Sequence, residues 1–225
     1  MHIFAAIVPP PEIRQELEAT VAAVAPRSGQ AATTEARPPT SHRKETTTRT
    51  FLRRRRPATA AGTGHDQLDQ KPFDQLLIPV THFGNLTTAD SVRLADELRM
   101  EAATWPSPTL HVHGGAALEW AGDLGVWARV EGDSEGLQHI GRSVPPLAQR
   151  LSLFVDRRMF RPWLQVGTIT DATSAPYLED LVAALDHFRG TSWQQQHLTL
   201  FRGRAEDDEG FDEVEQLALG GSSVC

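Results

Sequence analysis

The sequence predicts a mixed α and β protein of two similar lobes. Short apolar runs bounded by proline or glycine alternate with segments whose apolar residues have a helical spacing. A strand–turn–helix unit occurs twice at an offset of 86 positions, so that Val166 falls on Val80 and Thr173 on Thr87. The 225 residues, 40% of them apolar, suffice for one domain with a sizeable core. Such a duplication favours two lobes with a cleft between them.

Each element is predicted from its local pattern. The apolar, proline-bounded run at 2–8 indicates a buried strand, and the prolines that follow open a helix. Thr87 is a natural N-cap for the helix of the first repeat. In the helix expected at 134–153, Pro145 and Pro146 should cause a break or kink. The remaining expected elements are strands at 76–83, 109–120, 124–132 and 192–203, a strand–turn–helix unit at 161–190, and a helical turn or strand at 211–220.

The composition excludes several classes of protein. The only cysteine is Cys225, which excludes an internal disulfide framework and a cysteine-rich metal site. No apolar run approaches the roughly 18 residues of a membrane helix. The first residues lack the basic and apolar regions of a signal peptide. We therefore expect a cytoplasmic protein that does not associate with membranes.

The net charge of −7 is unevenly distributed. Residues 27–71 contain ten Lys or Arg and four Asp or Glu, a net +6, so the rest of the chain carries −13. An acidic body argues against broad, non-specific binding of nucleic acid. A small pocket for a nucleotide or an RNA end remains compatible with this charge.

Residues 27–72 interrupt the pattern of strands and helices. The interval is rich in Thr, Ala, Arg, Pro and Gly and has almost no large apolar residues, so we expect it to be disordered or loosely packed. Its basic run at 52–57 is either a solvated charge run or a patch for an anionic surface. The interval is either an insertion into a single domain that spans 1–225 or the product of a reading-frame slip in a GC-rich gene.

With these elements placed, the chain resembles the two-histidine phosphoesterases, specifically the bacterial 2′-5′ RNA ligase or RNA 2′,3′-cyclic phosphodiesterase branch. The resemblance rests on the initial HIFAAIVPPPEIRQEL, the two strand–turn–helix units and the closing FRGTSW…LTLFRG, and it covers residues 1–26 and 73–218. The stretch DRRMFRPWLQVGTITD is similar to actinobacterial members. The resemblance implies a bilobal α+β fold with pseudo-two-fold symmetry, in which two antiparallel-rich sheets face a central cleft with helices outside.

The resemblance also implies a reaction. Family members open cyclic phosphodiesters, or join 2′-5′ ends in the reverse sense, with one His-x-Thr or His-x-Ser motif from each lobe. One histidine acts as general base and the other as general acid, while the hydroxyl groups hold the phosphate. The implied partners are RNA 2′,3′-cyclic phosphate ends or cyclic nucleotides. The implied protein is a monomer that needs neither a metal nor another cofactor.

Both family motifs are degenerate in this sequence. The first reads His-x-Thr-x-x-x-x-Gly, and anchoring it on Gly84 places Leu77 at the histidine and Pro79 at the threonine. The second directly follows Phe-Arg-Pro, here at 160–162, so Trp163 and Gln165 occupy the histidine and hydroxyl positions. The offset between the motifs is again 86 positions. No catalytic residue of the family is therefore intact.

Other histidines are weaker candidates. His82 is the first alternative catalyst, but it lies an odd number of positions from Leu77, and a regular strand would turn it to the other face unless a bulge at Gly84 intervened. His111 and His113 share one strand face at a spacing that can bind a metal. Because no acidic third ligand is evident nearby, a surface or packed pair is the better interpretation.

Two further features have a structural and a functional interpretation each. The triplet at 197–199, His-Leu-Thr, has the composition of the family motif but lies on the closing strand, where the family has none, so we expect the match to be coincidental. Arg161 precedes the second motif and either binds a phosphate in bidentate fashion or forms a structural pair with an acidic neighbour.

The sequence therefore predicts a 2′-5′ RNA ligase family protein with weak or lost catalysis. Trp163 offers a ring face for a base, Gln165 a hydrogen bond to phosphate and Arg161 a charge, and these three are the expected substrate-binding residues. In the simplest alternative, Leu77 and Trp163 only fill the cleft. The alternative function is a non-catalytic module that binds a nucleotide or RNA end in the same cleft. A vestigial or truncated product is a third possibility, and whether the chain is an enzyme stays open.

Overall fold

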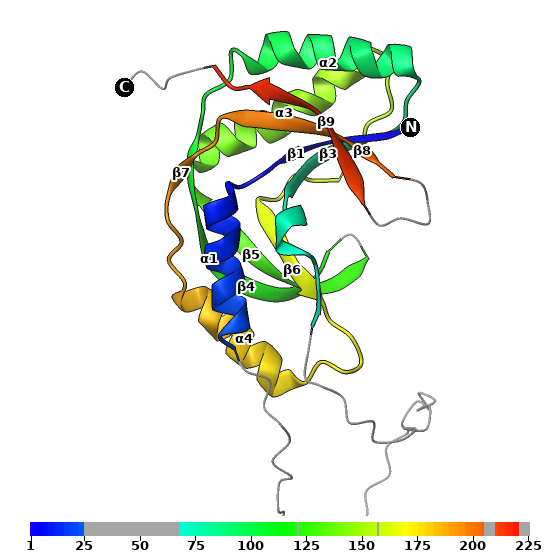
Figure 1. Ribbon diagram of the computed structural model, residues 1–225. Helices are drawn as coiled ribbons and strands as arrows, with labels where there is room; N and C mark the ends of the chain where they lie inside the picture. The colour runs from blue at the N-terminus through cyan, green and yellow to red at the C-terminus, as the bar shows by residue number, and fades with distance from the viewer. Residues whose placement is uncertain (25–67, 121, 157, 205–209, 221–225) are drawn as a thin grey trace, which may run out of the picture.

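Two antiparallel sheets form the frame of the protein (Figure 1). The computed structural model describes residues 1–24, 68–120, 122–156, 158–204 and 210–220, so the expectation of disorder at 27–67 lies outside the described residues. Sheet A has the order β3 (Ile78–Asn85), β1 (His2–Ile7), β8 (His197–Gly203), β9 (Phe211–Ala218). Sheet B has the order β2 (Asp69–Gln70), β6 (Trp163–Thr168), β5 (Asp123–Gly132), β4 (Thr109–Trp120), β7 (Trp193–Gln194).

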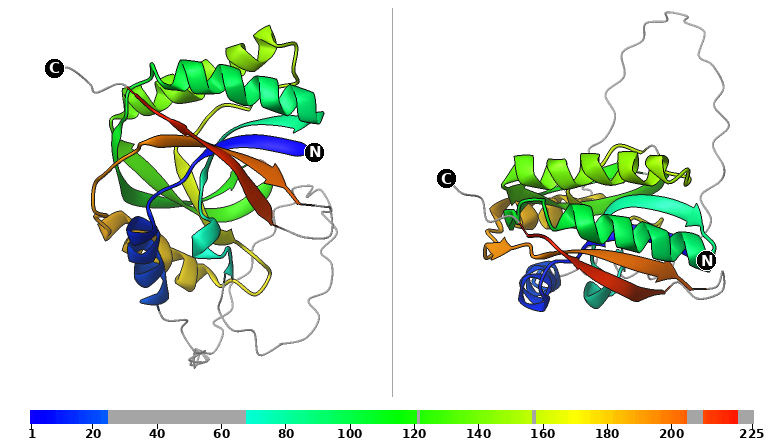
Figure 2. Two further views of the ribbon diagram at one scale, coloured as in Figure 1. Left: turned by 45° about the horizontal axis from the view of Figure 1, so that its top comes forward. Right: turned by 90° about the horizontal axis from the view of Figure 1, so that it is seen from above.

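Four α-helices of the described chain cover the outer faces of the sheets. They are α1 (Pro11–Ala22), α2 (Thr88–Ala102), α3 (Ser134–Arg150) and α4 (Ala175–His187), and a short 3₁₀ helix spans Phe73–Gln75. Figure 2 shows α2 and α3 side by side over sheet A. Helix α4 packs on β4 and β5 of sheet B, and α1 packs on α4. The predicted α+β fold of two antiparallel sheets with helices outside is thus confirmed. None of the described helices is long and apolar enough to cross a membrane.

The first two helices begin as their sequences predict. Helix α1 has a proline in its first turn and buries Ile13, Leu17 and Val21. Thr87 caps α2, because its hydroxyl accepts a hydrogen bond from the Asp90 backbone N–H at 3.1 Å. Local patterns alone therefore place both helices correctly.

Helix α3 corrects the expectation of a break at its prolines. It runs without interruption through Pro145 and Pro146. Each proline removes one hydrogen bond of the ladder and disfavours the preceding turn. The helix stays continuous because its apolar face, with Ile140, Val144 and Leu147 fully or almost fully buried, packs in the core shared by both lobes.

After the interval at 27–72, regular structure begins a few residues earlier than the sequence indicates. Residues 69–70 form β2, which pairs with β6 at the edge of sheet B, and Leu68 is buried in the core. The expected boundary at 72 is therefore too late. The sequence shows little sign of this strand, because β2 has only two residues and both are polar and exposed.

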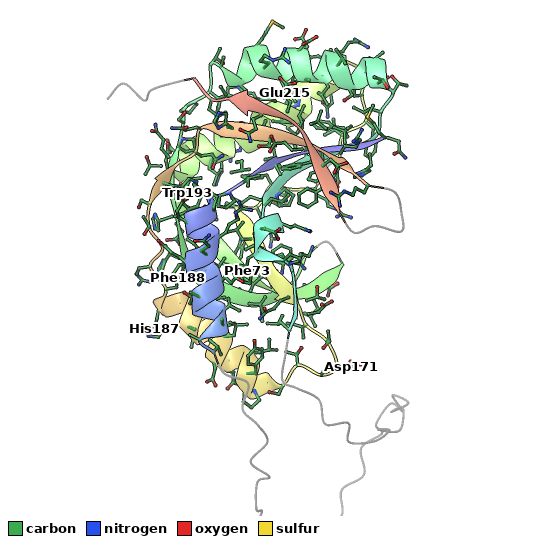
Figure 3. The ribbon with its side chains drawn as sticks, in the orientation of Figure 1. Phe73, Asp171, His187, Phe188, Trp193 and Glu215 are labelled. Atoms are coloured by element: carbon green, nitrogen blue, oxygen red, sulfur yellow. The ribbon has the colours of Figure 1, made fainter. Side chains whose placement is uncertain are left out.

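The last described segment is a strand, which decides between the two expected structures. Strand β9 pairs with β8 along its length. Glu215 of β9 lies beneath α2 (Figure 3), where its carboxylate accepts a hydrogen bond from Arg99 Nε at 2.8 Å. The strand thus completes sheet A and contacts the helix layer.

Candidate functional site

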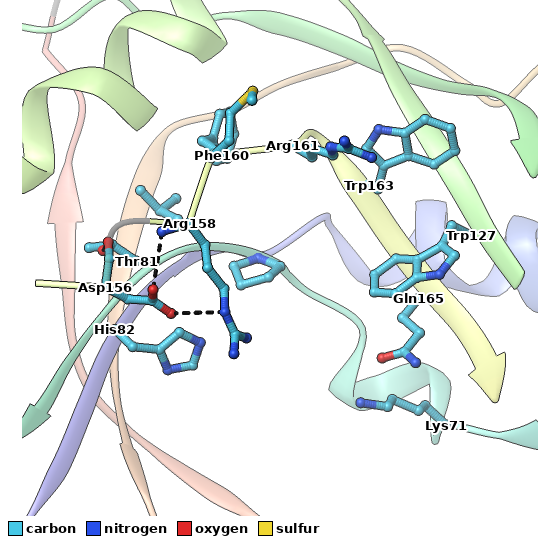
Figure 4. Close-up of a pocket in the computed structure, with 13 residues that line it drawn as sticks. Lys71, Thr81, His82, Trp127, Asp156, Arg158, Phe160, Arg161, Trp163 and Gln165 are labelled. Atoms are coloured by element: carbon cyan, nitrogen blue, oxygen red, sulfur yellow. Dashed lines mark hydrogen bonds and ion pairs between the residues drawn. The ribbon is translucent and has the colours of Figure 1, made fainter. Parts of the chain in front are cut away.

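A cleft between the two sheets contains two adjoining cavities. Their volumes are about 320 Å³ and about 510 Å³, and both are lined by Lys71, Pro79, Trp127 and Gln165. Pro79 comes from sheet A, while Trp127 and Gln165 come from sheet B. The cleft is thus built by both lobes, with the loop between α3 and β6 along its side (Figure 4).

The sheet A wall of the cleft owes its side chains to two irregularities in β3. Pairing with β1 joins Pro79 to Ala6 and His82 to Phe4, and the register shifts between these pairs and again after His82. Ala6 and Phe4 lie two apart on β1 and share one face, so Pro79 and His82 share that face too. Leu77 packs against the same aromatic cluster and lines the larger cavity.

His82 therefore faces the cleft and lines the smaller cavity. The expectation from regular alternation, that it points away from the Leu77 face, is wrong. Val80 has no partner on β1 and is buried in the core. Because of this one extra residue, His82 points to the same face of the sheet as Pro79. The left-handed backbone of Gly84, at φ 67°, accompanies the second shift. A bulge was foreseen at this glycine, but the one that turns His82 lies nearer the start of the strand.

The sheet B wall consists of alternate residues of β5 and β6. Trp127 pairs with Gln165 and Arg129 with Trp163, so these four side chains share the face toward the cleft. Trp127 is 5% exposed. Its indole Nε1 and Gln165 Nε2 are buried, and neither atom has a hydrogen-bond partner among the described residues. Two donors without a partner favour a ligand that supplies acceptor oxygens.

The third wall is the loop from 151 to 162. Asp156 is tied to sheet A, since its N–H donates to the His82 carbonyl at 2.9 Å. Its carboxylate accepts a hydrogen bond from the Arg158 N–H at 3.1 Å and lies 3.5 Å from Arg158 Nε. Arg161 also lines the cavity. With Lys71 opposite, three cationic side chains and one carboxylate surround the smaller cavity, which favours an anionic ligand.

The four positions that the sequence assigns to the family motifs converge on this cleft. Pro79, Trp163 and Gln165 line the smaller cavity, and Leu77, Pro79 and Gln165 line the larger one. Positions 86 residues apart in the sequence are thus brought together from two sheets. None of the four side chains can exchange a proton near neutral pH.

Sequence reasoning missed several residues of the site. Lys71, Trp127, Asp156 and Arg158 line the smaller cavity, and His2 lies beside His82 but lines neither cavity. His2 was detectable in principle, because it lies two positions from Phe4 on one strand face. The charged run just before the second motif was the only sign of the loop residues. Nothing local marks Trp127, since its place depends on the pairing of β5 with β6.

The His111 and His113 pair has an acidic neighbour that sequence reasoning did not find. Glu131 is the cross-strand partner of His111, and its carboxylate accepts a hydrogen bond from His113 Nδ1 at 3.1 Å. Arg129 Nε lies 3.0 Å from the same carboxylate. The contact with His113 and the neighbouring charges lower the pKa of Glu131. Among the described residues no group of three or more His, Cys, Asp or Glu is arranged to hold a metal ion.

The 197–199 triplet lies outside the cleft. It is on β8 in the middle of sheet A, and neither His197 nor Thr199 lines either cleft cavity. Thr199 is 3% exposed and paired with Ala6 and Gln216 in the sheet. The expectation that the match to the family motif is coincidental agrees with this place.

The pKa of His82 lies below the ordinary value of a histidine, mainly because the imidazole is buried. The charge on His2 lowers it further, Asp156 raises it and Arg158 lowers it. The unfolded chain therefore takes up a proton at a higher pH than the folded chain does. The stability that the neutral ring contributes is present above about pH 6.5 and is lost as the pH falls through the folded pKa.

Replacement of His82 is expected to make the free energy of unfolding depend less on pH below neutrality. Between about pH 7 and about pH 5, the free energy of unfolding should fall less steeply in His82→Asn than in the natural protein. Urea denaturation across this range measures the slopes. Gln138→Asn, on the exposed face of α3, changes no titratable group and should keep the natural slope. Equal slopes for His82→Asn and the natural protein would show that the pKa of His82 is not lowered.

Comparison with solved structures identifies the architecture. No family model and no curated protein sequence matches the chain. E. coli LigT complexed with NADP⁺ is similar over 98% of both chains, at 16% identity and a TM-score of 0.59. The chain has the LigT fold.

Two further structures share the LigT fold with this chain. A protein described as a phosphoesterase matches at 17% identity and a TM-score of 0.60, over 98% of this chain and 99% of its own. TT0787 of Thermus thermophilus matches at 16% identity and a TM-score of 0.54, with the same coverage. LigT and these two proteins support the expected bilobal α+β architecture. At such identities the comparison establishes the fold and not the activity.

Proposed function

We propose that this LigT-fold chain binds a nucleotide or the 2′,3′-cyclic phosphate end of an RNA in its cleft, and that its phosphodiester chemistry is weak or lost. The observation that carries the proposal is the convergence of Leu77, Pro79, Trp163 and Gln165 on a cleft with cationic walls. A place for the ligand is retained, while the expected acid and base are replaced.

The loss of activity follows from the chemistry of the replacements. Opening a cyclic phosphate requires a base that takes a proton from water and an acid that protonates the leaving ribose oxygen. Each such group contributes roughly 10²–10⁴-fold. Leu77 and Trp163 provide neither, and Pro79 has no hydroxyl and no backbone N–H.

Retained binding is supported by the side chains that remain. Trp163 presents an aromatic ring, on which a base can stack, and Gln165 and Trp127 present unpaired N–H donors. Lys71 and Arg158 supply positive charge from opposite walls. LigT has been crystallised with NADP⁺, 3′-AMP, ATP and phosphate, and a nucleotide in the cleft of this chain is consistent with these complexes.

A second candidate function is a weak phosphodiesterase that uses relocated groups. The specific observation in its favour is the position of His82, an ionisable side chain on the cavity wall. This candidate requires that hydrolysis of 2′,3′-cyclic AMP by the natural protein disappears in His82→Asn.

Replacement of Gln165 is expected to weaken nucleotide binding. Gln165→Leu removes a buried donor and acceptor from the cleft, so the affinity for 2′,3′-cyclic AMP should fall by about tenfold. Isothermal titration calorimetry measures this change. Gln138→Leu, on the exposed face of α3, should bind as the natural protein does. No binding by the natural protein would refute the proposed function.

A further inference from the structure

We propose that the cleft holds the anionic group of its ligand at the end formed by His82, His2 and Arg158, away from the four signature positions. The anion is the phosphodiester or phosphomonoester of a nucleotide or RNA end. This inference rests on the proposed function, since it assigns a place to the phosphate within the same cleft.

The two imidazoles lie next to each other on neighbouring strands of sheet A. Their ring centroids are 5.5 Å apart, at an angle of 42° between the planes. The His82 ring is stacked on Phe4 at 5.2 Å, and Phe4 is stacked on Phe201 at 5.3 Å. This aromatic row fixes the orientation of His82 on the cavity wall. The exposed His2 ring lies beside it, so one phosphate group could accept hydrogen bonds from both imidazoles.

Arg158 supplies the permanent charge at this end. Asp156 contacts Arg158 through Nε at 3.5 Å, and the two terminal amino groups extend past this contact on the side of His82 (Figure 4). Arg158 is 61% exposed and Asp156 25% exposed, so the carboxylate is the more buried partner and anchors the guanidinium. The carboxylate offsets one positive charge. Protonation of either imidazole leaves this group of side chains with a net positive charge.

The signature positions offer a poorer environment for an anion. Leu77 and Pro79 have no side-chain donor, and Gln165 offers only a neutral amide. Hydrogen bonds from charged donors to phosphate are about twice as strong as those between neutral groups. The His82 end therefore provides the stronger phosphate contacts, while Trp163 is left for the base.

The experiment compares the affinities of variants that each remove one donor to the phosphate, for two probes, 2′,3′-cyclic AMP and adenosine. We expect His82→Asn and Arg158→Gln each to weaken the binding of 2′,3′-cyclic AMP by about tenfold. Both should bind adenosine as the natural protein does, because only the phosphate contact is removed. The matched control is Arg93→Gln, since Arg93 is 57% exposed and pairs with Asp90 on the same segment at 3.2 Å.

A direct readout complements the affinities and does not depend on the fold of a variant. Inorganic phosphate added to the natural protein should shift the NMR signals of the His82 and His2 rings and raise the pKa of His82. If these signals do not move, or if both variants bind 2′,3′-cyclic AMP as tightly as Arg93→Gln does, the inference is wrong. If the natural protein binds neither nucleotide nor adenosine, the proposed function fails. The two failures are therefore distinguishable.

Discussion

Restoring the four signature residues is expected to raise the rate of 2′,3′-cyclic AMP hydrolysis by about 10²–10⁴-fold. The variant combines Leu77→His, Pro79→Thr, Trp163→His and Gln165→Thr. These positions already converge on one cleft from two sheets, so the new imidazoles would recreate a reaction site there, in addition to the anion site at the His82 end. The gain is measured by chromatography, as the rate at which 2′,3′-cyclic AMP is converted to 2′-AMP or 3′-AMP.

Each matched control restores the two signature residues of one lobe only. Leu77→His with Pro79→Thr, or Trp163→His with Gln165→Thr, should give much smaller gains, because the acid and the base act as a unit. If the natural protein already hydrolyses 2′,3′-cyclic AMP as fast as the variant with all four substitutions, the assignment of the four positions is wrong. His82 is then the first residue to replace.

Removing the ring of Trp163 is expected to lower the affinity for 2′,3′-cyclic AMP by roughly 10–100-fold, because stacking of a base on an aromatic side chain contributes about 1–3 kcal/mol. Trp163→Ala removes the aromatic ring on which the base would stack, while Trp163→Phe keeps an aromatic ring and should retain most of the affinity. Calorimetric titration of the three proteins gives the comparison.

A second aromatic residue controls for general effects of removing a ring. Phe154 is 67% exposed, packs against Gly84 and lines neither cleft cavity. Phe154→Ala should therefore bind the nucleotide as the natural protein does. If Trp163→Ala also binds normally, the ring only fills the cleft, as the simplest interpretation of the sequence allows.

The parts of the site that could be predicted depend on local patterns and on the internal repeat. The offset of 86 positions identified Leu77 with Trp163 and Pro79 with Gln165, and the structure brings all four to one cleft. Equivalent positions in two similar lobes can meet in one cleft when the lobes pack together. The strand and helix periods supplied the rest of the frame.

The parts that could not be predicted depend on strand register and tertiary packing. His82 was placed on the wrong face because a register shift in β3, between Pro79 and His82, breaks the alternation. Glu131 was not foreseen beside His113, since only the pairing of β4 with β5 joins them. The unbroken course of α3 through Pro145 and Pro146 reflects its buried face, a tertiary effect that overrides local preference.

The most direct test of the central claim is to equilibrate the natural protein with 2′,3′-cyclic AMP and then quantify both the bound fraction and the intact nucleotide. The account predicts that the natural protein binds the nucleotide saturably and leaves almost all of it unchanged. The variant with all four substitutions should hydrolyse it. Rapid turnover by the natural protein, or no binding at all, would contradict the account.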